Sequence, residues 1–103
     1  MSAITRNVVV RRWGTPQATE GSVNEAREWE EQGHRVNEKW VYHAPRHEPA
    51  RPRARIFYWL RYDFVASYVV DADGRTVRDD PRPLVAGIAD RLFVPATRNA
   101  GAR

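Results

Sequence analysis

Residues 55–71 constrain the fold of this chain more than any other segment, because this stretch carries six large aromatic side chains. Aromatic and β-branched residues favour strands, so the segment predicts β-structure rather than a helix. It is too long for one ordinary strand, and we therefore predict two strands with a bend near residues 63–66. The aromatic positions are Phe57, Tyr58, Trp59, Tyr62, Phe64 and Tyr68.

Large side chains occupy both faces of this segment, since successive residues of a strand point to opposite sides. Phe57 and Trp59 would share one face, and Ile56, Tyr58 and Leu60 the other. A single covering layer would leave one of these apolar faces exposed to solvent. We therefore predict a homodimer that covers the second face.

The first third of the chain shows one strand pattern and one helix pattern. Three consecutive valines between charged residues predict a buried strand within residues 4–13. Ser22 and Glu25 have the spacing of a capping box, which predicts a helix over residues 23–32. Gly33 would end that helix in a left-handed conformation.

The remaining segments complete an α+β pattern. Apolar and polar residues alternate over 35–43, which predicts a half-buried strand, and three prolines then exclude regular pairing over 44–54. Residues 71–78 resemble a hairpin with a turn at Gly74. An apolar stripe that starts after Pro81 predicts a second helix ending near residue 92.

These elements predict a two-layer sandwich, with an antiparallel or mixed sheet and two helices on one face. Residues 1–95 would form a single α+β domain, and residues 96–103 a disordered polar tail. With no secretory signal pattern and no apolar run long enough for a membrane span, we expect a cytoplasmic protein without a membrane partner.

Catalytic and metal-binding patterns are weak in this sequence. The chain has no cysteine, and its histidines His34, His43 and His47 lack the spacing and partners of a zinc site. Ser67 lies outside any nucleophile elbow, and the scattered glycines form no phosphate-binding loop. We therefore expect no metal and no cofactor, and more a binding protein than an enzyme.

Charge is the strongest functional signal. The chain has a net charge of +4, and its basic residues are nearly all arginine, which binds phosphates in bidentate fashion. Acidic residues gather in 20–31, whereas arginines dominate the proline-rich connection. This separation predicts a small DNA-binding regulatory or accessory protein, for example in transcription or replication control, with DNA rather than RNA as the partner. The predicted contacts are Arg11, Arg12, Arg46, Arg51, Arg53, Arg55 and Arg61.

Two alternatives compete with nucleic-acid binding. In the first, aromatic residues line a pocket for a small molecule, as in a cofactor-free cyclase-like or monooxygenase-like domain, with Arg61 or Asp63 as acid or base. That pocket would be formed by Trp40, Tyr42, Tyr58, Trp59 and Tyr62. In the second, the chain is a protein-interaction subunit whose acidic helix contacts a protein partner.

Overall fold

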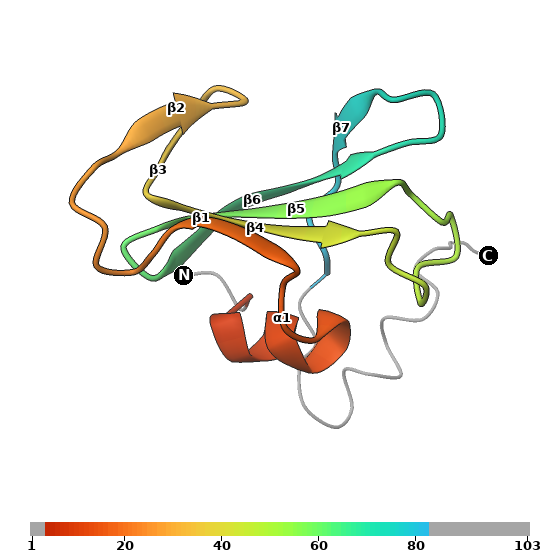
Figure 1. Ribbon diagram of the computed structural model, residues 1–103, viewed down its shortest axis with the longest axis horizontal. Coiled ribbons are helices and arrows are strands. Elements are labelled where there is room, and N and C mark those ends of the chain that lie inside the picture. Colours follow the sequence, from red (N-terminus) through yellow and green to blue (C-terminus); the bar gives the residue numbers. More distant parts are fainter. Residues whose placement is uncertain (1–3, 83–103) are drawn as a thin grey trace.

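A five-stranded antiparallel sheet, a two-stranded hairpin and one helix make up the computed structural model, which describes residues 4–82 (Figure 1). The sheet has the order β1-β4-β5-β6-β7, and β2 pairs with β3 in the hairpin. The elements are α1 (Arg6–Trp13), β1 (Ala18–Gly21), β2 (Trp29–Glu31), β3 (His34–Val36), β4 (Glu38–His43), β5 (Ala54–Leu60), β6 (Asp63–Val70) and β7 (Thr76–Arg78). The α+β class and the antiparallel sheet are confirmed. The described residues contain one helix rather than the predicted two.

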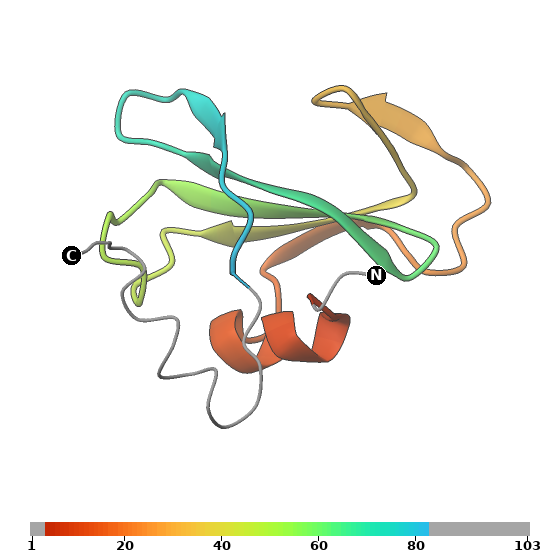
Figure 2. The ribbon, with the colours of Figure 1, turned by 180° about the vertical axis from the view of Figure 1, so that it is seen from behind.

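The sheet is covered on both faces by the same chain. Figures 1 and 2 show α1 on one side of the sheet and the β2–β3 hairpin on the other. Phe57 and Trp59 of the central strand β5 pack in the cluster under α1, and Tyr58 packs in the cluster under the hairpin. All three side chains are fully buried. The aromatic strand therefore has two cores without a second copy, and the homodimer stays a prediction.

The predicted strand at residues 4–13 is wrong, because this segment forms α1. Thr5 caps the helix, with its hydroxyl accepting from the backbone N–H of Val8, and Gly14 ends it at a φ of +83°. Val9 is buried against the sheet, while Val10 remains 41% exposed. Burial of one helical side and the two caps thus override the strand preference of the valines.

The predicted helix at residues 23–32 is also wrong. Its apparent capping box is a turn, in which the N–H of Glu25 donates to the Ser22 carbonyl. Gly33, expected to stop a helix, instead has a φ of +80° in the tight β2–β3 turn. In the strand, Trp29 packs over the core on the hairpin side. The packing of this one large side chain outweighs the weak amphipathic preference of the segment for a helix.

The other strand predictions agree with the structure in part. The single strand predicted over 35–43 is two strands, β3 and β4, which belong to different sheets and are separated by Asn37. Val36 therefore packs in a different core from Trp40 and Tyr42. Residues 44–53 form the predicted connection. The aromatic segment divides into β5 and β6, although the reversal falls at residues 61–62 rather than at 63–66. The hairpin at 71–78 is confirmed.

The predicted second helix from Pro81 to residue 92 falls almost entirely outside the described residues, and the predicted tail at 96–103 wholly so. Within residues 4–82, the helix α1 is neither long enough nor apolar enough to cross a membrane.

Candidate functional site

The proline-rich connection is held against the end of α1. The indole Nε1 of Trp13 donates to the Glu48 carboxylate at 2.7 Å, and the Trp13 and His47 rings lie 5.6 Å apart. The hydroxyl of Tyr42 also donates to the carbonyl of Gly14 at 2.8 Å. These contacts bring residues 11–14 and 44–53 together, and we call this part of the molecule the basic end.

Arg55 anchors the basic end from inside. Its side chain is 4% exposed, and its Nε and one terminal nitrogen donate to both carboxylate oxygens of Glu48 at 2.6 and 2.8 Å. The other contacts reach the Ser67 hydroxyl and the carbonyl and carboxylate of Asp79. All five N–H donors of the guanidinium are therefore used within the protein. Arg55, predicted to contact nucleic acid, lies where its guanidinium cannot reach a phosphate.

Arg61, also predicted to contact nucleic acid, likewise binds groups within the protein, but far from the basic end. It donates to the carbonyl of Glu25 at 2.5 Å and to the Glu28 carboxylate at 2.9 Å. Its backbone N–H donates to the side chain of the fully buried Asn37, whose amide group binds the Ser22 and Glu25 carbonyls. Arg61 thus fastens the segment before β2 to the β5–β6 turn.

The five other predicted arginines differ from Arg55 and Arg61 in their pairing. Among residues 4–82, none of these five forms an ion pair, whereas most other cations do. All five are exposed. Burial, together with repulsion by Arg55, lowers the pKa of Arg12, and the nearby Glu48 opposes this shift. The five unpaired residues are Arg11, Arg12, Arg46, Arg51 and Arg53.

The acidic residues of 25–31 lie at the opposite end of the molecule from the basic connection. Figures 1 and 2 show the 44–53 connection at one end of the sheet and the β2–β3 hairpin at the other. Glu28 pairs with Arg35 and Arg61, and Glu31 accepts from Lys39 at 2.6 Å. The acidic segment and the basic connection are therefore also apart in space, whereas Glu48 and Asp79 lie at the basic end and pair with Arg55. The predicted acidic helix is absent, and its carboxylates lie on the hairpin and the segment before it.

Two adjacent clefts open at the basic end. The smaller one, of about 360 Å³, is lined by Arg46 and Arg51 together with Ala44, Pro45 and Pro52. The larger one has a volume of about 450 Å³, and Ala44, Pro45 and Arg46 belong to its lining as well. Its remaining lining residues are Trp13, Thr15, Gln17, Tyr42, His43 and His47. Sequence reasoning found the arginines of this region but missed Trp13 and Gln17, which only the folded chain brings there, and it interpreted His47 as an ordinary loop histidine.

The predicted aromatic pocket residues do not line one common cavity. Trp40, Tyr42 and Trp59 pack in the cluster under α1, whereas Tyr58 packs on the other face of the sheet. Tyr62 is 60% exposed. The sequence pattern could not separate core aromatics from pocket aromatics, because both types favour the same half-buried strand positions.

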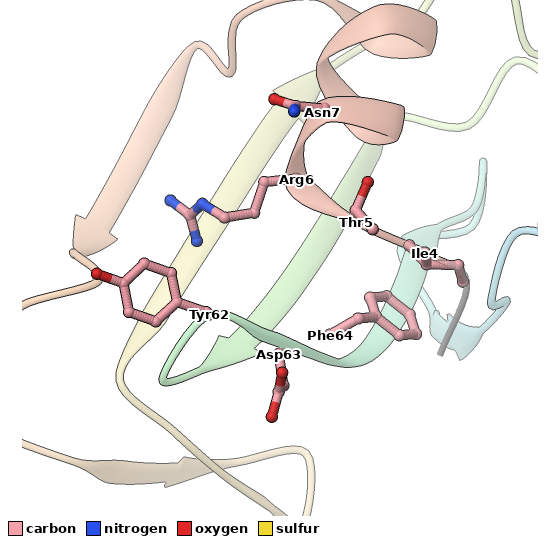
Figure 3. Close-up of a pocket in the computed structure, with 7 residues that line it drawn as sticks. All are labelled: Ile4, Thr5, Arg6, Asn7, Tyr62, Asp63 and Phe64. Atoms are coloured by element: carbon pink, nitrogen blue, oxygen red, sulfur yellow. The ribbon is translucent and has the colours of Figure 1, made fainter. Parts of the chain in front are cut away.

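A third, wider cleft of about 840 Å³ lies between the start of α1 and the β5–β6 turn. Figure 3 shows Arg6 pointing from the helix toward Tyr62, and Asp63 pointing away from the helix. Arg6 already donates to both oxygens of the buried Glu38 at 2.7 and 2.9 Å, so its charge is neutralised within the protein. This cleft therefore offers no unpaired cation, and the residues that line it are Ile4, Thr5, Arg6, Asn7, Tyr62, Asp63 and Phe64.

The buried hydroxyl of Tyr42 at the floor of the larger cleft supports a prediction about alkaline pH. Burial raises the pKa of Tyr42 to about 12, above the usual value near 10. Such a group stabilises the fold fully below pH 10, and this contribution is lost as pH rises toward 12. Between about pH 9 and pH 11, the free energy of unfolding should fall by about 1 kcal/mol less in Tyr42→Phe than in the wild type. Urea titrations at both pH values would measure the difference. Equal losses in both proteins would contradict this assignment.

A comparison with known proteins finds no matching protein-family model, no significantly similar curated protein and no significantly similar solved structure. The functional argument therefore rests on the geometry of the chain.

Proposed function

We propose that this protein binds nucleic acid through the basic end, as a small regulatory or accessory protein with DNA rather than RNA as its partner. The observation that carries the proposal is the set of five exposed arginines without ion pairs among the described residues. Guanidinium groups without an internal carboxylate are free to bind phosphates, and binding releases the counterions of the nucleic acid.

The position of the carboxylates adds to this support. Acidic side chains would repel a phosphate backbone. Those of the β2–β3 hairpin and the segment before it lie at the other end of the sheet, and Glu48 at the basic end is paired with Arg55. A protein partner, if one binds the acidic residues, would contact this hairpin. The small-molecule alternative receives less support, because its aromatic residues are divided between two packed cores.

The salt dependence of binding tests the proposal. We expect the double variant Arg46→Ala/Arg51→Ala to reduce the slope of log affinity against log salt by about 0.7 to 0.9 units, the contribution of one phosphate contact, because both arginines line the same small cleft. Fluorescence anisotropy with labelled single-stranded and duplex DNA and with RNA, at about 50 and 200 mM salt, would measure it.

A matched control removes the same charge elsewhere. Arg27 and Arg35 are also exposed, but they pair with Glu20 and Glu28, away from the basic end. We expect Arg27→Ala/Arg35→Ala to leave the slope nearly unchanged. Absence of binding to every probe at low salt, or an equal effect of both double variants, would refute the proposed interface.

A further inference from the structure

The two clefts at the basic end differ in chemistry and share one wall. The smaller cleft presents the unpaired guanidinium groups of Arg46 and Arg51, which suit a phosphate. The larger cleft presents ring and amide groups from His43, His47 and Gln17. Because Arg46 lines both, a group bound in one cleft lies next to a group bound in the other.

His47 is the side chain in the larger cleft best placed to stack on a ligand. It is exposed, and its ring rests on Trp13 with a centroid distance of 5.6 Å and an interplanar angle of 59°. Trp13 is itself held by its hydrogen bond to Glu48 and by an edge contact with Phe57 at 5.0 Å. The His47 ring therefore has a rigid support on one side, and stacking on a supported ring costs little entropy.

Polar groups at the rim of the larger cleft complete the site. The side-chain carbonyl of Gln17 accepts from the backbone N–H of His43, and the amide NH₂ of Gln17 makes no hydrogen bond within residues 4–82. The lining also includes the hydroxyl of Thr15. A planar group with hydrogen-bonding edges, such as a nucleobase, matches this combination.

Two of the five non-glycine residues with positive φ within residues 4–82 lie in the walls of these clefts, and the other three lie in the β2–β3 and β5–β6 turns. Ala44 has a φ of +44° and Arg51 a φ of +49°, values that residues with a Cβ rarely adopt. Both residues line the smaller cleft, and Ala44 also lines the larger one. Strain of this kind persists where surrounding contacts hold the backbone, and it is common at ligand-binding loops.

The geometry points to single-stranded nucleic acid as the ligand of the basic end, with one unstacked base in the larger cleft against His47 and its phosphate in the smaller cleft between Arg46 and Arg51. This inference rests on the proposed function and names its substrate class. In a duplex the faces of each base are covered by its neighbours, so a base can enter a ring-lined cleft only from a single strand or after leaving the helix.

The test compares three probes of equal length: an oligothymidylate, an abasic oligomer with the same phosphates, and a duplex. We expect the wild type to bind the oligothymidylate about five- to a hundredfold more tightly than the abasic oligomer, the range for stacking of one base. His47→Ala should lose this preference, and His47→Phe should keep it because the phenyl ring still stacks. His34→Ala, at the hairpin end where His34 contacts Tyr68, is the control and should keep the preference.

The outcomes separate this inference from the function on which it rests. Equal binding of all three probes, still weakened by Arg46→Ala/Arg51→Ala, would overturn the base site and leave nucleic-acid binding in place. A base preference that survives in His47→Ala would overturn the placement of the base. No binding of any probe would overturn both.

Discussion

Arg55→Met is expected to lower the free energy of unfolding by about 3 to 5 kcal/mol, because it removes one partner of a buried ion pair. The side chain of Glu48 is only 12% exposed and would lose both of its hydrogen bonds from Arg55. The hydroxyl of Ser67 would lose a donor as well. Urea unfolding followed by tryptophan fluorescence would measure the change.

Arg53→Met is the matched control for this prediction. Arg53 lies two residues earlier, is exposed and forms no ion pair within residues 4–82, so its substitution should change the free energy of unfolding by less than about 0.5 kcal/mol. Similar stabilities of the two variants would show that the contacts of Arg55 with Glu48, Ser67 and Asp79 do not hold the connection to the sheet.

The hydrogen bonds between Arg55 and Glu48 also predict how the stability of the fold depends on pH in the acid range. Burial opposes the ionisation of Glu48, but hydrogen bonds from Arg55 and Trp13 outweigh it and hold the pKa of Glu48 below its usual range. A carboxylate with a lowered pKa stabilises the fold above its unfolded-state pKa near 4.3 and loses this contribution as pH falls further. The stability difference between the wild type and Arg55→Met should therefore shrink below about pH 4.

Gly21→Ala is expected to destabilise the protein by about 3 to 5 kcal/mol, the combined cost of a strained backbone and of overpacking. Gly21 has a φ of +73°, and a Cβ there would lie 2.1 Å from the carbonyl oxygen of Asn37. It would also approach the Trp29 ring at 3.2 Å. The atom in conflict belongs to the backbone, so β1 or the β3–β4 junction would have to move.

Gly33→Ala separates the two causes, since Gly33 has a φ of +80° but open space around its Cβ position. We expect a loss of only about 1 kcal/mol, the cost of the backbone conformation alone. Thermal or urea unfolding of both variants gives the comparison. If Gly33→Ala cost as much as Gly21→Ala, the close approach of Gly21 to Asn37 would not be the cause.

The candidate site was only partly visible in the sequence. The cluster of arginines around three prolines predicted an exposed basic connection, and the structure exposes Arg46, Arg51 and Arg53 there. Nothing in the local pattern distinguishes Arg55 from Arg53. Arg55 lies within β5, where its guanidinium is buried against Glu48 and Asp79, whereas Arg53 precedes the strand and is exposed. The contribution of Trp13 depends on a helix that the valine pattern did not predict.

The sequence alone was sufficient to predict secondary structure where its local conformational preferences are strong. The aromatic segment specified two strands with two apolar faces, the prolines a break in pairing, and Gly74 a hairpin turn, because each of these residue types has few conformational alternatives. Residues 4–13 and 23–32 have weaker and conflicting preferences. Only packing against the two faces of the sheet, with Val9 buried on one and Trp29 on the other, decided between helix and strand. Tertiary contacts supply more free energy than the small differences in local propensity, so they determined these elements and the arginines left unpaired.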